Sequence, residues 1–87
     1  MDPSLHQQQG INHLRKVLAY APMVADGDTS QVHLTREDWY VVADTLFTLD
    51  TPREALPEAI VSFDLANDNQ TIRLVTTGGL TVDVEQM

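Results

Sequence analysis

The residues that could do catalytic chemistry are few and scattered. The chain has three histidines, His6, His13 and His33, and no cysteine. A histidine can act as a general acid or base near neutral pH, but a catalytic site also needs a partner group that orients it or a nucleophile that it activates. None of the three lies in a spaced metal-binding pair, a glycine-rich phosphate loop or a nucleophile motif. The sequence therefore predicts a protein that is not an enzyme and uses no cofactor.

One segment carries oxygen-bearing side chains in a regular pattern. The twelve residues from Asp26 to Glu37 lie between two predicted helices and resemble the calcium-binding loop of the EF-hand family. The resemblance implies side-chain ligands at loop positions one, three, five and twelve, which here are Asp26, Asp28, Ser30 and Glu37. The family has glycine at position six, where this chain has Gln31. Calcium binding is therefore a minor alternative, and a polar connecting loop is the simpler interpretation.

Charge is the most distinctive property of the sequence. The formal net charge is −8, and all of it arises in residues 37–87, where ten acidic residues accompany two arginines. A field of this sign repels nucleic-acid phosphates and anionic membranes and attracts basic surfaces. We therefore expect a protein partner with a basic surface, with no direct nucleic-acid binding and no membrane binding. The acidic candidates for partner contact are Glu54, Glu58, Asp64, Asp68, Asp83 and Glu85.

An amphipathic helix is predicted from Thr35 to Leu49. Thr35 is a good N-cap, and Asp38 three residues later completes a carboxylate form of the capping box. The apolar face comprises Trp39, Val42, Ala43, Leu46 and Leu49. Tyr40 and Val41 lie outside that face, so they are the apolar candidates for contact with a partner or with a second copy of the chain.

The periodicity elsewhere predicts an α+β fold in one small domain, residues 1–87. A first helix is expected over 4–21 and a short third helix after Thr51, which Pro57 ends. Alternating β-branched residues then predict three strands, at 59–66, 71–76 and 80–85, and residues 31–34 read as a short extended piece. We therefore expect a helical half, 1–57, and a three-stranded antiparallel β-meander, 58–87, that packs on the second helix.

The register of the meander follows from its turns and its apolar residues. A loop centred on Asp68 and Asn69 should place Leu65 opposite Ile72, and a three-residue loop, 77–79, should place Leu74 opposite Val82. In this register the apolar face comprises Val61, Phe63, Leu65, Ile72, Leu74, Leu80, Val82 and Val84. On the other face Arg73 lies between Asp64 and Asp83, which predicts charge pairing across the strands.

These features indicate a small, acidic, non-catalytic interaction module that binds and inhibits or regulates a larger basic or nucleic-acid-handling protein. The size and charge are typical of phage- or plasmid-encoded inhibitors, some of which imitate DNA with spaced carboxylates. The polar N-terminal residues and the absence of a long apolar run predict a cytoplasmic protein. The main alternative is a structural or assembly subunit that forms a homodimer through the helix of residues 35–49.

Overall fold

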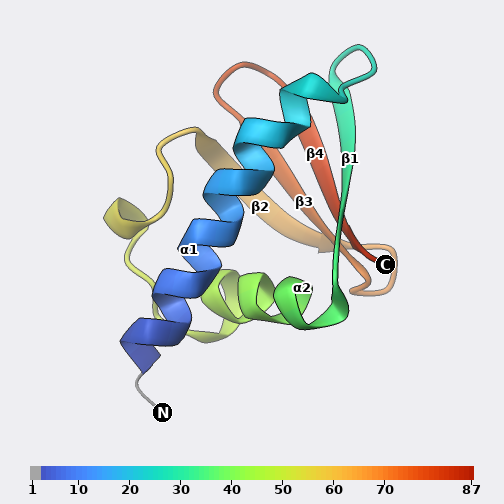
Figure 1. Ribbon diagram of the computed structural model, residues 1–87. Helices are drawn as coiled ribbons and strands as arrows, with labels where there is room; N and C mark the ends of the chain where they lie inside the picture. The colour runs from blue at the N-terminus through green and yellow to red at the C-terminus, as the bar shows by residue number, and fades with distance from the viewer. Residues whose placement is uncertain (1–2) are drawn as a thin grey trace.

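The computed structural model describes residues 3–87 and shows an α+β fold (Figure 1). Two helices and four strands make up most of the chain. They are α1 (Pro3–Tyr20), β1 (Thr29–Leu34), α2 (Arg36–Ala43), β2 (Ile60–Ala66), β3 (Thr71–Thr76) and β4 (Thr81–Gln86). Both helices lie on one face of the sheet, and the other face is open (Figure 1). Within the described residues, no helix is both long enough and apolar enough to cross a membrane.

The sheet has one strand more than the sequence predicted. Its order is β1-β4-β3-β2, and β1 pairs with β4 in parallel, from Thr29 opposite Thr81 to Leu34 opposite Gln86. The prediction of a purely antiparallel three-stranded meander was therefore wrong, because the extended piece at 31–34 is an edge strand of the same sheet. Strand β1 lies within residues 1–57, the part of the chain for which mainly helices were expected.

The meander itself has the predicted register. Leu65 lies opposite Ile72, and Leu74 lies opposite Val82. The β2–β3 turn contains three successive residues in the left-handed region, Asn67 to Asn69, with φ between 54° and 64°. Gly79 has a φ of 84° in the β3–β4 turn, which is the conformation that its loop class requires. Local turn chemistry thus fixes both hairpins.

Val61 is an exception to the predicted apolar face. The pairing of β2 with β3 shifts between Ile60 and Ser62, so Val61 is an extra, bulged residue. Its side chain is 55% exposed, whereas that of Ile60 is fully buried. A bulge inserts one residue without a partner and turns the strand, which is why the alternation is broken here.

The predicted short third helix is a 3-10 turn, and the second helix changes its geometry near its end. The segment after Pro52 forms a single 3-10 turn, η3 (Arg53–Ala55). Thr35 caps α2 as predicted, because its Oγ1 accepts a hydrogen bond from the N–H of Asp38 at 3.2 Å. Beyond Ala43 the helix widens into a π-helical turn, η2 (Asp44–Thr48).

Helices α1 and α2 cross closely at Gly10. A Cβ atom on Gly10 would lie 1.9 Å from Oγ1 of Thr45 and 3.1 Å from the carbonyl oxygen of Val41. The hydroxyl of Thr45 donates to that same carbonyl at 2.9 Å. A side chain at position 10 would therefore push the helices apart, so glycine is required by the packing despite its cost of ~1 kcal/mol in a helix.

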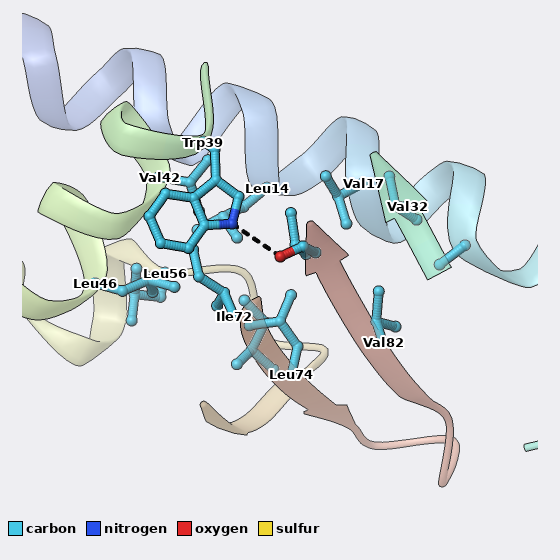
Figure 2. Close-up of a cluster of buried hydrophobic side chains, with 13 residues drawn as sticks. Leu14, Val17, Val32, Trp39, Val42, Leu46, Leu56, Ile72, Leu74 and Val82 are labelled. Atoms are coloured by element: carbon cyan, nitrogen blue, oxygen red, sulfur yellow. Dashed lines mark hydrogen bonds between the residues drawn. The ribbon is translucent and has the colours of Figure 1, made fainter. Parts of the chain in front are cut away.

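The core lies between the helix layer and the sheet, with Trp39 of α2 near its centre (Figure 2). The indole Nε1–H donates to the carbonyl oxygen of Val84 on β4 at 2.8 Å, so the buried ring has its polar atom satisfied. Fully buried residues around it come from α1, α2 and all three strands of the meander. They are Leu14, Val42, Ile60, Ile72, Leu74, Val82 and Val84.

Candidate functional site

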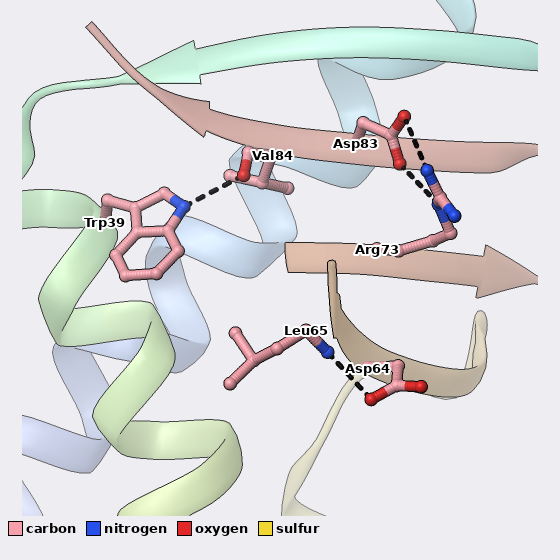
Figure 3. Close-up of polar contacts among 6 residues, drawn as sticks. All are labelled: Trp39, Asp64, Leu65, Arg73, Asp83 and Val84. Carbon is pink, nitrogen blue, oxygen red and sulfur yellow. Dashed lines mark hydrogen bonds and ion pairs between the residues drawn. The ribbon is translucent and has the colours of Figure 1, made fainter. Parts of the chain in front are cut away.

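The open face of the sheet carries a row of polar residues that crosses all four strands. The register places Gln31 of β1, Asp83 of β4, Arg73 of β3 and Asp64 of β2 side by side. Arg73 donates to Asp83 through Nε at 2.9 Å and through Nη2 at 3.5 Å (Figure 3). This hydrogen bond and the charge of Asp83 raise the pKa of Arg73. The row is thus an exposed polar surface with a single close ion pair.

Asp64 does not share in that ion pair. Its Oδ1 accepts a hydrogen bond from the backbone N–H of Leu65 at 2.8 Å (Figure 3). The predicted position of Asp64 opposite Arg73 is confirmed, but its carboxylate bonds to the backbone instead of pairing with Arg73. Asp64 therefore remains an exposed acidic group on the open face, whereas the charge of Asp83 is offset by Arg73.

The two other acidic candidates of the meander lie at the end of the sheet that carries the β2–β3 turn. Glu85 is half-buried, with Oε2 3.6 Å from Nε2 of His33 on the neighbouring β1. Asp68 is exposed in the turn itself, where it has a φ of 56°. Because the turn leads directly into β3 opposite Glu85, both carboxylates border the same end of the open face.

Glu54 and Glu58 lie apart from the open face. Both are exposed and line a hollow of about 370 Å³ around η3, together with Arg53, Leu56 and Pro57. The guanidinium of Arg53 donates to the carbonyl oxygen of Ile60 at the start of β2. The structure therefore separates the six acidic candidates into a group on the sheet and a pair beside η3.

The apolar candidates Tyr40 and Val41 differ from each other. Tyr40 is 50% exposed and packs edge-on against Trp39, with the ring centroids 5.3 Å apart. Val41 is less exposed than Tyr40, and its carbonyl lies at the crossing with α1. Of the two, Tyr40 offers the larger surface for contact.

The four candidate calcium ligands are not brought together. Ser30 is buried, and its hydroxyl donates to the carbonyl oxygen of Ala21 at 2.8 Å. Ser30 lies within strand β1, whose six residues extend over ~20 Å between the turn that holds Asp26 and Asp28 and the helix that holds Glu37. Within residues 3–87 no group of three or more acidic or histidine side chains is placed to hold a metal ion.

Each histidine lies beside a carboxylate that is distant in the sequence. His6 and His13 of α1 approach Asp44 and Asp38 of the second helical segment, at 3.2 Å and 3.4 Å. The third pair, His33 with Glu85, joins β1 to β4. No spacing in the sequence could have shown these pairs, because the crossing of the helices and the parallel strand pairing create them. They connect elements and do not converge on one site.

A hollow lies beside β1, between the edge of the sheet and the second half of α1. Its volume is about 580 Å³. The side chains that line it include Val17, Tyr20, Val32, Leu34 and Met87. Tyr20 is 49% exposed and Met87 is 81% exposed. No motif in the sequence predicted this hollow, although the apolar residues that run past the end of the first helix, Tyr20 to Val24, were a signal for it.

The arrangement of the described residues offers surfaces on which another molecule could bind. It combines an open polar sheet face, an exposed sheet edge and an apolar hollow beside that edge. No family model, no curated protein and no solved structure matches this chain.

Proposed function

We propose that this protein is a small acidic module that binds a larger protein with a basic surface and so inhibits or regulates it. One observation carries the proposal. Among the side chains described from Leu5 onward, Arg73 with Asp83 is the one ion pair that involves an arginine or a lysine. Most of the carboxylates that give the formal net charge of −8 therefore have no arginine or lysine partner among these side chains. A field of this kind speeds encounters with basic proteins and disfavours acidic ones.

The exposed carboxylates define where such a partner would be attracted. Glu54 and Glu58 lie beside η3, and Asp64 and Asp68 lie on or next to the open sheet face. If the partner handles nucleic acid in the cytoplasm, these groups would compete with phosphates for its basic surface. The function needs no catalysis, because occupation of the surface is sufficient.

The test is affinity capture from a host-cell lysate. The protein is immobilised, the lysate is applied at low and at high salt, and the retained proteins are then challenged with duplex DNA. We expect the retained proteins to be basic and to be released by salt, because screening weakens contacts between exposed charges. Release by duplex DNA would identify the partner surface as one that binds nucleic acid. Retention of nothing at low salt, or of acidic and basic proteins alike, would contradict the proposal.

A homo-oligomeric assembly subunit remains the alternative. It is favoured by Tyr40 of α2, whose ring is half exposed. Light scattering at high concentration separates the two functions: a dimer that is disrupted by Tyr40→Asp would support the alternative, and a strict monomer would remove it.

A further inference from the structure

Strand β1 has a free edge. It lies at one end of the sheet order, and within residues 3–87 no strand lies beyond it. The carbonyls of Asp28 and Leu34 accept hydrogen bonds from Thr81 and Met87, at 2.8 Å and 2.9 Å. Even-numbered residues of this segment therefore direct their backbone groups toward β4 and odd-numbered residues direct theirs outward, because these directions alternate along a strand.

The outward-facing backbone groups differ along β1. Those of Thr29 are bonded to Asp26 in the preceding turn, with N–O distances of 2.8 Å and 3.3 Å. The remaining outward N–H and C=O groups are those of Gln31 and His33. They form a template onto which another strand can add.

A hollow lies on each side of this edge. The hollow on the helix side has a volume of about 580 Å³, and the one on the open side has a volume of about 520 Å³. Both are lined by Val24, Gln31 and His33, so the edge itself separates them. Successive side chains of an added strand would point alternately into the two hollows.

The two hollows select different chemistry. On the helix side the lining is mainly apolar, with Val17, Tyr20, Val32 and Leu34, although His13, Lys16 and Asp38 also contribute to it. On the open side it contains the carboxylate of Asp26 and that of Asp83, which is already bonded to Arg73, and β1 contributes uncharged polar residues, Thr29 and Gln31. An apolar side chain suits the first hollow, and a lysine or an arginine suits the second.

We propose that β1 takes an extended segment of the partner as a fifth strand, in which apolar residues alternate with basic ones. This inference rests on the proposed protein-binding function and names the site and the form of the partner. The apolar residues enter the hollow beside α1, and the basic residues enter the hollow on the open side, which Asp26 lines. The backbone bonds to Gln31 and His33 hold the segment in place.

A second copy of the chain is a poorer occupant. If two β1 strands paired, their apolar side chains would already be engaged in their own cores, since Val32 is only 4% exposed. The hollow beside α1 would then stay unfilled. Two chains of charge −8 would also repel each other.

The experiment uses the full chain labelled with ¹⁵N and a synthetic peptide of about eight residues in which valine and lysine alternate, long enough to span β1. We expect the amide signals of Gln31 and His33 to shift and to become protected from exchange. Peptides in which serine replaces valine, or glutamate replaces lysine, should bind at least about tenfold more weakly. Equal binding of all three peptides, or shifts confined to other strands, would overturn the proposal.

Methylation of the peptide backbone tests the strand geometry without any change to the protein. In an added strand, either the valines or the lysines direct their N–H groups toward β1, and the other set directs them away. We expect N-methylation of one class to abolish binding and N-methylation of the other to leave it intact. If N-methylation of the lysines abolishes binding, the peptide adds antiparallel to β1. If N-methylation of the valines abolishes binding, it adds parallel to β1. If both peptides bind, or if neither does, strand addition is wrong.

A pair of protein variants provides the matching control. Gln31→Pro removes the outward N–H without removing a bond to β4, and Gln31→Val keeps that N–H. We expect the proline variant to lose peptide binding by about tenfold and the valine variant to retain it, with both folded by circular dichroism. Equal binding by the two folded variants would contradict the proposal.

The outcome also separates this inference from the proposed function. Salt-sensitive capture of a basic protein, with no peptide binding at β1, would overturn strand addition and leave the function standing. Peptide binding without capture of any basic protein would support strand addition at β1 and overturn the proposed function. Shifts of Gln31 and His33 that depend on protein concentration alone would identify a second copy as the occupant and overturn the proposal.

Discussion

The two edges of the sheet differ in how far the chain protects them. At the β2 edge, Val61 forms a bulge, Arg53 covers the carbonyl of Ile60, and the N–H of Leu65 is bonded to the carboxylate of Asp64. At the β1 edge, the turn at Asp26 covers only Thr29. Bulges and covering side chains are the usual means by which a protein prevents unwanted strand pairing. The contrast indicates that the β1 edge is the one available for a partner.

The largest expected effect tests the bulge that protects β2. Ile60 is fully buried, whereas its neighbour Val61 is 55% exposed. Ile60→Ala should lower the free energy of unfolding by about 2–5 kcal/mol, because it leaves a cavity in the core. Val61→Ala should change it by less than about 0.5 kcal/mol. Urea unfolding measures both values, and similar losses for the two variants would mean that Val61 faces the core and that β2 has no bulge.

An intermediate effect is expected where β1 is held in position. The hydroxyl of Ser30 donates to the carbonyl of Ala21 inside the protein. Ser30→Ala would leave that carbonyl with only the N–H of Val24, which donates at 3.2 Å, and should cost about 0.5–1.5 kcal/mol. Ser62→Ala on β2 is the matched control, because Ser62 is exposed, and it should cost less than about 0.5 kcal/mol. If thermal unfolding shows no difference between them, the bond to Ala21 does not hold β1 in place.

The smallest effect concerns the side chain that covers the β2 edge. Arg53→Met keeps most of the aliphatic side chain but removes the donor to Ile60. We expect a loss of about 0.5–1 kcal/mol in urea unfolding, because that carbonyl must then bond to water. Arg36→Met is the control: Arg36 makes one long exposed contact, 3.5 Å to Gln86, so its loss should be smaller. A larger loss for Arg36 would weaken the view that Arg53 protects this edge.

The parts of the fold that the sequence predicted correctly depend on short-range signals. The residues of the β2–β3 turn and Gly79 determine their loops locally, and the alternation in β2 to β4 then sets the register. The cap at Thr35 is likewise local. The facing positions of Asp64, Arg73 and Asp83 followed from that register, so this part of the open face could be predicted from the sequence.

The missed features depend on contacts between distant residues. Next to the bulge at Val61, Arg53 and Thr77 donate hydrogen bonds to backbone carbonyls at the start of β2. Such contacts leave no periodic pattern in the sequence. The hollow beside β1 depends on where α1 lies over the sheet, and Gly10 sets its close crossing with α2. Periodicity shows which face of an element is apolar, but it does not show how two elements cross.

The parallel pairing of β1 with β4 also affects how the protein folds. Thr29 pairs with Thr81, 52 positions later, so helix α2 and two strands lie between the partners. Contacts of such high contact order require a long loop to close and form slowly compared with hairpins. We therefore expect the hairpins of β2 to β4 to form first and β1 to dock afterward. The free edge would then exist only on completely folded molecules, and a partner that binds it would not recognise nascent or partly unfolded chains.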